Sequence, residues 1–281
     1  MSCSDVVDSS LLQLDSGQCI ALHDFAESRG RFSGAVFLVA SGPSVLTFPM
    51  QRYSHIPMIA MNGSIARFIE EGIKPLFYLC DDRGVAKRKG AAVAQGITLA
   101  ENAGLGLAAL QEVAKHSPHA LTAGKLHLLE RVNRQRESAA MSDRRFAWSV
   151  RNDPEYAVEW SLFRQKRNRI GFSRNLCNGY FNGRTIAYAA LQLAYHLGFD
   201  RVYLVGVDMS PEQGQFYDPQ GLQVPSRLGD DYADYILPSF ELMSRRVLSD
   251  SFQVFNLSVD SRLPSDVIKK IKYNQLDDLL A

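Results

Sequence analysis

The stretch 183–208, GRTIAYAALQLAYHLGFDRVYLVGVD, constrains the fold of this chain more than any other segment. Its first half carries apolar residues at helical spacing, namely Ile186, Ala190, Leu193 and Leu197. Gly198 follows where a helix C-cap is expected. The second half, 202–207, is a short apolar run rich in β-branched residues, which predicts a buried strand. A helix followed at once by a buried strand is half of a βαβ unit, so we predict a parallel sheet covered by helices on both faces.

Three further apolar runs predict strands, and each is followed by polar or turn-forming residues. The runs 36–40, 57–61 and 75–80 end at Ser41-Gly42-Pro43-Ser44, Asn62-Gly63-Ser64 and Asp81-Asp82. In the same way, Gly206 and Asp208 lie at the end of the predicted strand 202–207. Ligands bind beyond the carboxyl ends of parallel strands. We therefore expect all four groups to lie along one edge of the sheet. Helices are expected over 65–71, 91–116, 230–248 and 263–271, and a last strand over 252–257.

Composition adds limits to this picture. The chain has 281 residues, 46% hydrophobic and 22% charged, which is typical of a soluble globular protein. The net charge of +1 gives no overall argument for nucleic-acid binding. The four cysteines lack metal-ligand spacing, and their scatter favours a reducing compartment. Because no secretory signal and no apolar run of about 18 residues is seen, we expect a cytoplasmic protein without a membrane span.

Residues 125–174 are strongly basic, rich in arginine, and interspersed with aromatic residues. A solvated helical face with a few aromatic anchors is one common interpretation. The functional alternative is a lid that meets an anionic surface, such as a phosphorylated lipid or a polyanionic glycan. We predict a single domain over 1–281, with a core at about 30–90 and 176–281 and a basic helical insertion or lid at about 91–175.

Several segments together resemble the WaaZ family of lipopolysaccharide-core proteins. They are SGP at 41–43, AMNGS at 60–64, KPLFYLCDD at 74–82, RTIAYAALQLAYHLGFDRVYLVGVDMS at 184–210, FYD at 216–218 and FNLSVDSR at 255–262. More distantly, the SGPS turn, the Asn62 turn, Thr185 and GVD are similar to bacterial sialyltransferases that use a CMP-sugar. Sialic acid and 3-deoxy-manno-octulosonic acid (Kdo) are both 2-keto acids activated as CMP esters, so the two resemblances agree.

The resemblance implies an α/β fold with a single Rossmann-like, GT-A-like domain. It implies a glycosyltransferase that moves Kdo from CMP-Kdo to the Kdo region of the lipopolysaccharide inner core and releases CMP. No separate cofactor is implied, and a metal is less necessary because the leaving group is a single phosphate. The implied partners are CMP-Kdo, a lipid A–core acceptor and the anionic inner face of the inner membrane, which the 125–174 segment would meet. No nucleic acid is implied, and the oligomeric state stays open.

Donor-binding positions follow by resemblance. Ser41, Gly42, Pro43 and Ser44 would hold the nucleotide through backbone N–H groups, and Gly206 stands at the same edge. Asn62, with Gly63, would bind the donor, although Asn62 also suits a left-handed turn. Thr185 matches a donor-contacting position. Arg184 would pair with the Kdo carboxylate or a phosphate, unless it is a surface arginine.

Catalytic positions are Asp82, Asp208 and Tyr217. Asp82 is either a ligand to ribose or acceptor, or a helix cap, while Asp208 is a nucleotide contact or a strand-end cap. Tyr217 would give a hydroxyl to the leaving phosphate. The sialyltransferases place a histidine base after this loop, but residues 210–240 contain no histidine, and His196 favours a structural role within the central helix. The base is open among four carboxylates: Asp82, Asp208, Asp230 and Asp231.

Three alternatives remain from the sequence. The first is another CMP-sugar transferase of the sialyltransferase kind. The second is a pterin pyrophosphokinase-like enzyme, which would need ATP and Mg²⁺. The third is a non-catalytic protein that binds core glycolipid and neither binds nor hydrolyses CMP-Kdo.

Overall fold

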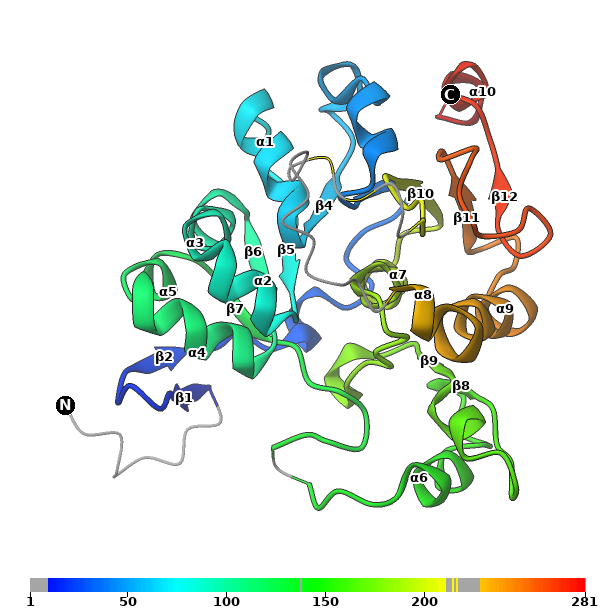
Figure 1. Cartoon of the computed structure of the whole chain (residues 1–281), viewed down its shortest axis with the longest axis horizontal. Helices are drawn as coiled ribbons and strands as arrows, with labels where there is room; N and C mark the ends of the chain where they lie inside the picture. The colour runs from blue at the N-terminus through cyan, green and yellow to red at the C-terminus, as the bar shows by residue number, and fades with distance from the viewer. Residues whose placement is uncertain (1–9, 137, 211–213, 215, 217–227, 281) are drawn as a thin grey trace.

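The computed structural model describes residues 10–136, 138–210, 214, 216 and 228–280, and a parallel eight-stranded sheet runs through its centre (Figure 1). The strand order is β12-β11-β10-β3-β4-β5-β6-β7, and every neighbouring pair is parallel. In chain order these strands are β3 (Ala35–Val39), β4 (Met58–Met61), β5 (Phe77–Cys80), β6 (Asn102–Leu105), β7 (Leu126–Leu128), β10 (Arg201–Val205), β11 (Gln253–Asn256) and β12 (Lys269–Lys270). A short antiparallel pair, β1 (Leu11–Gln13) with β2 (Cys19–Ala21), precedes the sheet.

Helices cover both faces of the sheet. Successive strand residues point to opposite sides, and because both sets are apolar, each face must be covered. In β3, Val36 and Leu38 belong to one buried apolar cluster, while Phe37 and Val39 belong to the other. The first cluster includes α7 (Ile186–Leu197) and α9 (Leu237–Arg246). The second includes helices on the other face: α1 (Ile65–Glu71), α2 (Arg83–Arg88), α3 (Gly90–Leu99), α4 (Leu107–His116), α5 (Ala120–Ala123) and α10 (Tyr273–Leu280). The predicted α/β fold with a covered parallel sheet is confirmed.

The order of the strands reverses at β3. From β3 the chain builds the sheet outward through β4, β5, β6 and β7, and then returns to place β10 on the other side of β3. Between these halves α7 ends at Gly198, whose φ of 99° and N–H bonds to helix carbonyls form the expected left-handed C-cap. The β3–β10 boundary is therefore a topological switch point, where open α/β sheets bind their ligands.

Two sequence-based boundaries are corrected. The expected helix 91–116 is divided into α3 and α4 by β6, and β7 follows, so the sheet extends through residues predicted as insertion. The β6 sequence Asn-Ala-Gly-Leu lacks β-branched residues because space is short: a Cβ on Gly104 would lie 2.8 Å from a methyl carbon of Leu79 in β5. The expected helix 263–271 is also wrong, since this stretch leads into β12 and the last helix is α10.

The true insertion, residues 129–182, is named here the basic subdomain. It contains α6 (Asp143–Ser149) and an antiparallel pair, β8 (Tyr156–Val158) with β9 (Gly171–Ser173). It lies below α7, α8 and α9 in the view of Figure 1. The predicted helical character is limited to α6 and short 3₁₀ turns.

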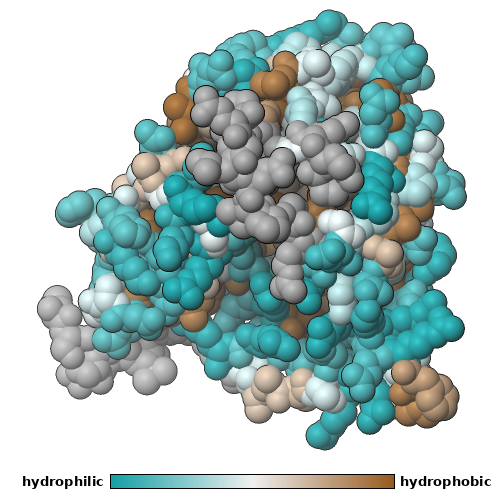
Figure 2. Space-filling model, viewed as in Figure 1, coloured by the Kyte–Doolittle hydropathy of each residue, from teal (hydrophilic) through white to brown (hydrophobic). Residues whose placement is uncertain are grey.

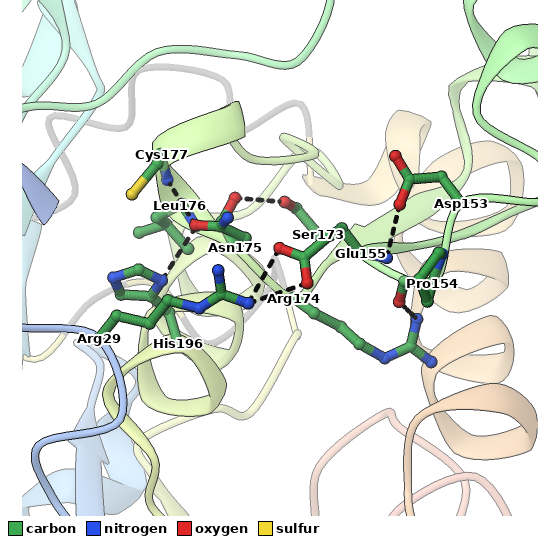
Figure 3. Close-up of polar contacts among 10 residues, drawn as sticks. All are labelled: Arg29, Asp153, Pro154, Glu155, Ser173, Arg174, Asn175, Leu176, Cys177 and His196. Atoms are coloured by element: carbon green, nitrogen blue, oxygen red, sulfur yellow. Dashed lines mark hydrogen bonds and ion pairs between the residues drawn. The ribbon is translucent and has the colours of Figure 1, made fainter. Parts of the chain in front are cut away.

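Polar contacts fasten the basic subdomain to the core (Figure 3). Arg29 Nη2 donates to both carboxylate oxygens of Glu155, at 2.8 and 2.9 Å. His196 of α7 accepts from the N–H of Leu176 at Nδ1, at 3.2 Å, so its Nε2 carries the proton and donates to the carbonyl oxygen of Phe25 at 2.9 Å. Burial lowers the pKa of His196, which favours this neutral tautomer. The structural role that the sequence favoured for His196 agrees with these contacts.

Candidate active site

A cavity of about 550 Å³ lies at the switch point, beyond the carboxyl ends of β10, β3, β4 and β5. All four strand-end groups predicted to share an edge contribute to it. Together with the base candidate Asp231, eight of the predicted donor-binding and catalytic residues line it: Ser41, Gly42, Asn62, Asp82, Arg184, Thr185, Gly206 and Asp208. Asp81, Arg131, Tyr180 and Asn182 also line it. The convergence of strand ends, inferred from sequence alone, thus corresponds to a real concave site.

Asp208 fixes the loop that follows β3. Its side chain is buried, and Oδ1 accepts from Ser44 Oγ at 2.5 Å while Oδ2 accepts from the Ser44 N–H at 3.0 Å. Ser44 Oγ also lies 2.7 Å from Ser258 Oγ. On the other side, the N–H of Gly42 donates to the carbonyl oxygen of Gly206 at 2.9 Å. Only glycine fits at 42, because a Cβ there would lie 2.4 Å from Asp208 Oδ2.

This arrangement changes the expectation for the SGPS turn. The N–H groups of Gly42 and Ser44 bind protein acceptors, and Pro43 has no N–H. Pro43 and Ser44 line a separate cavity on the other side of Asp208. The turn as a whole is therefore not the backbone anion site that was predicted, and only Ser41 and Gly42 reach the main cavity.

Asn62 lines the cavity and carries a buried, unpaired acceptor atom. Its backbone is left-handed, with φ of 49°, in the turn after β4. Its Oδ1 is buried and has no hydrogen-bond partner among the described residues. Such an atom needs a donor to offset its desolvation, which a ligand hydroxyl or amine would supply. Gly63 is buried and does not line the cavity.

The N-terminus of α7 faces the same cavity. Thr185 is its N-cap residue but makes no side-chain capping bond, and Ile186 and Ala187 of the first turn line the cavity. The first N–H groups of a helix have no partner within the helix, and they favour anions. Arg184 adds a positive charge here, with Nε 3.9 Å from Asp231 Oδ1 and its guanidinium 5.0 Å from the centre of the Tyr235 ring. The strongest anion-binding feature is therefore at Arg184–Ala187, not at the SGPS turn.

The two carboxylates after β5 have different roles. Asp82 is the N-cap of α2, with Oδ1 accepting from the N–H of Val85 at 3.1 Å, so its cap interpretation is confirmed. Asp81 instead accepts through Oδ2 from the Tyr180 hydroxyl and from Arg131 Nη2, the latter at 2.9 Å. Burial first, and then the Asp81 charge, raise the pKa of Tyr180 well above its ordinary value. Tyr180 therefore acts here as a neutral donor.

Sequence reasoning missed the cluster of Asp81, Arg131 and Tyr180. The only signal was the Asp81-Asp82 pair, from which Asp82 was preferred, whereas Asp81 is the member that contacts Arg131 and Tyr180. Arg131 and Tyr180 stand at the two ends of the basic subdomain and meet through a parallel bridge, with the N–H of Val132 donating to the Tyr180 carbonyl at 3.1 Å. No local pattern reports a contact between such distant residues.

The segment 228–236 contributes one carboxylate, that of Asp231, to the cavity wall. This segment consists of α8 (Leu228–Asp231) and a π-helical turn (Tyr232–Ile236), a form of helix that is frequent at functional sites. Asp231 lines the cavity, and no hydrogen bond to its carboxylate is present among the described residues. Asp230 is exposed and outside the lining. Tyr217 lies outside the described residues.

Three non-glycine residues with left-handed backbones line this one cavity: Asn62, Arg184 and Met209, with φ of 49°, 59° and 57°. Such conformations cost roughly 1–3 kcal/mol each and persist where the surrounding structure imposes them. Their gathering makes this cavity the candidate functional site of the fold.

Comparison with known proteins places the chain in a family. The sequence model of the family described as 3-deoxy-D-manno-octulosonic acid transferase WaaZ matches residues 22–274. The chain belongs to the WaaZ family. Two bacterial relatives are each described as a probable 3-deoxy-manno-octulosonic acid transferase. That of Salmonella typhimurium LT2 is 27% identical over 242 residues, covering 85% of this chain and 87% of the relative. That of Escherichia coli K12 is 26% identical over 253 residues, covering 88% and 85%.

A solved structure shares the fold. The MAf glycosyltransferase from Magnetospirillum magneticum AMB-1 superposes with a TM-score of 0.50 at 15% identity, over 93% of this chain. The present chain spans only 35% of that longer protein, so the likeness concerns the fold alone. The WaaZ match, by contrast, includes both the sheet and the basic subdomain, so the whole site described above falls within the family region.

Two further observations on the described part of this WaaZ-family protein concern membrane-spanning helices and metal sites. No helix there has both the length and the apolar character required to traverse a bilayer. No grouping of three or more histidine, cysteine, aspartate or glutamate side chains arranged to hold a metal ion occurs there.

Proposed function

We propose that this WaaZ-family protein transfers Kdo from CMP-Kdo to a sugar hydroxyl in the inner core of lipopolysaccharide. The observation that carries the proposal is the anion-binding helix start at Arg184–Ala187, inside the cavity at the switch point. The donor has two anionic groups close together, the Kdo carboxylate and the single phosphate. A helix N-terminus beside an arginine is suited to such a pair.

The other strand ends suit the rest of the donor. Ser41, Gly42 and Gly206 form the wall at the β3–β10 boundary, where a nucleoside fits against exposed backbone. We assign to this wall the cytidine. Asn62 Oδ1, buried and unpaired, would accept from a ribose or Kdo hydroxyl.

In the proposed reaction, the acceptor oxygen forms a bond to C2 of Kdo while the bond from C2 to the phosphate oxygen of CMP breaks. The electron pair leaves with CMP, and the helix start with Arg184 stabilises the departing phosphate. A base takes the proton of the acceptor hydroxyl. We assign this role to Asp231, because the other three carboxylates that line the cavity are engaged: Asp81 with Tyr180 and Arg131, Asp82 with Val85, and Asp208 with Ser44.

A one-pot assay tests the proposal. Purified protein is incubated with Kdo₂–lipid A and with CMP-Kdo generated in situ, and EDTA is added to half of the samples after the donor has formed. We expect mass spectrometry to show a product heavier by one Kdo, with and without EDTA. Loss of product only with EDTA would overturn metal independence. If no product forms and CMP-Kdo does not protect the protein against heat, the Kdo-transfer proposal fails.

An apolar end of the basic subdomain suits the membrane on which such an acceptor resides. Four side chains there are exposed: Phe163 (89%), Leu162 (51%), Trp148 (48%) and Trp160 (41%). Apolar side chains gather at the lower right corner of Figure 2, where Figure 1 places this end of the basic subdomain. Arg151 lies 3.4 Å from the Trp148 ring centre, and Arg145 and Arg164, on the same segments, are also exposed. Aromatic side chains with flanking cations favour an anionic bilayer surface, so we propose peripheral binding at the inner face of the inner membrane.

Exchange of Leu162 and Phe163 for serine should therefore weaken binding to vesicles. Burying a leucine or phenylalanine side chain contributes about 1.5–3 kcal/mol, so the fraction of protein that sediments with phosphatidylglycerol vesicles should fall at least roughly ten-fold. The matched control exchanges Leu46 and Ile69, which are also exposed but lie outside the basic subdomain. Equal binding by the Leu162/Phe163 variant and the control would contradict the membrane proposal.

A further inference from the structure

The main cavity continues into the basic subdomain. A second cavity of about 200 Å³ shares Arg131, Tyr180, Asn182 and Arg184 with the first. A third, of about 480 Å³, shares several residues with the second: Arg134, Asp143, Asn168, Arg169 and Tyr235. The three cavities thus form a continuous groove that leads from the switch point into the basic subdomain.

Cations dominate the lining of this groove outside the main cavity. Asp143 is the only acidic residue among the described lining residues of the second and third cavities. The cations that line them are Arg131, Arg134, Arg144, Lys166, Arg169 and Arg184. Several of these cations are already paired within the protein. Arg169 Nε lies 2.6 Å from Asp143 Oδ2, and Lys166 Nζ lies 2.5 Å from Asp234 Oδ2.

Arg134 and Arg144 are the lining cations whose positive charge is not paired with an acidic side chain among the described residues. Neither has an ion pair or a side-chain hydrogen bond among the described residues, and both are exposed. Two unpaired guanidinium groups on a concave surface attract carboxylates and phosphates, which they bind in a bidentate manner. The groove therefore selects an anionic ligand long enough to span from the switch point to Arg144.

The location of Asp231, the assigned base, shows which end of the groove is close to the proposed reaction. Asp231 in the main cavity and Tyr235 in the second and third cavities are four residues apart on one helical segment, so they lie on the same face. A ligand that lies along Tyr235 would extend one end toward Asp231. That end would meet the donor at Arg184, which lines both cavities.

We propose that this groove is the acceptor site and that it takes an acidic saccharide, whose carboxylate or phosphate groups are bound by Arg134 and Arg144. The inference rests on the proposed Kdo transfer and adds to it the place and chemical class of the acceptor. The acceptor hydroxyl reaches Asp231 at the inner end of the groove.

The test is the variant Arg134→Gln/Arg144→Gln. Its control is Arg31→Gln/Lys74→Gln, which removes the same charge from exposed residues preceding β3 and β5, at the opposite edge of the sheet. We expect the KM for Kdo₂–lipid A to rise about ten-fold or more in the groove variant, with little change in kcat, because binding is lost equally before and during the reaction. The control should keep the wild-type KM.

A second measurement separates this inference from the proposed reaction. Binding of fluorescently labelled protein to Kdo₂–lipid A micelles is followed without donor, at low and at moderate salt. If wild-type protein binds and the groove variant binds about ten-fold more weakly, the groove stands even where no transfer occurs. An unchanged KM in the groove variant of an active enzyme would overturn the groove, as would no binding by wild-type protein or an equal loss in the control.

Discussion

Replacement of Asp231 by asparagine is expected to lower kcat by roughly 10²–10⁴-fold, the range that a positioned general base contributes. The substitution keeps the size of the side chain and removes its ability to accept the acceptor proton. Among the described residues Asp231 makes a single long ion pair, at 3.9 Å to Arg184, so the fold should keep its stability. Single-turnover rates with saturating CMP-Kdo and Kdo₂–lipid A would measure the effect.

Asp230 provides a matched control for this experiment. It is the adjacent carboxylate on the same segment, but it is exposed and does not line the cavity. Asp230→Asn should therefore keep kcat within about two-fold, since surface changes away from the site have small effects. Similar losses in both variants would point to the charge of the segment, and an unaffected Asp231→Asn would require another base.

Replacement of Asp208 by alanine should produce the second large effect, through the loop after β3. The variant leaves the N–H and the hydroxyl of Ser44, which is partly buried, without their carboxylate partner. Each unpaired buried group costs about 1–3 kcal/mol, so the free energy of unfolding should fall by roughly 2–4 kcal/mol. Because Gly42 contacts both Asp208 and the cavity, we also expect the stabilisation of the protein by CMP to be lost.

Ser44→Ala distinguishes loop anchoring from direct contact with the donor. If Asp208 acts by holding the loop, Ser44→Ala should reproduce much of the loss of CMP stabilisation, and the double variant should lose less than the sum of the two. Chemical denaturation, and thermal shift with CMP, would be measured for the four proteins of this double-mutant cycle: wild type, the two single variants and the double variant. Wild-type CMP stabilisation in Ser44→Ala, with none in Asp208→Ala, would show instead that Asp208 itself touches the nucleotide.

The parts of this site that the sequence predicted are those encoded by contiguous patterns. Apolar runs ending in SGPS, NGS and GVD determine where strands stop, and parallel pairing brings their ends to one edge. The sequence could not decide between Asp81 and Asp82, because the choice depends on which carboxylate caps α2 and which meets Arg131. It also missed β6, whose small residues serve packing against Leu79 and resemble a helix in composition. The sequence also could not show which N–H groups of the SGPS turn are free. Asp208 and Gly206, which accept from two of these N–H groups, are far from the turn in sequence.

The neighbouring strands at the switch point, β3 and β10, are separated in the chain by the whole of residues 40–200. During synthesis, β3 leaves the ribosome long before β10 exists, so one edge of a buried, strongly apolar strand stays unpaired while the rest of the sheet is made. Sheets closed by such distant pairing fold slowly, and an open apolar edge favours association with other chains. N-terminal fragments that end before Arg201 should for this reason aggregate, and the cavity at the switch point is complete only once the chain has been translated as far as Asp231.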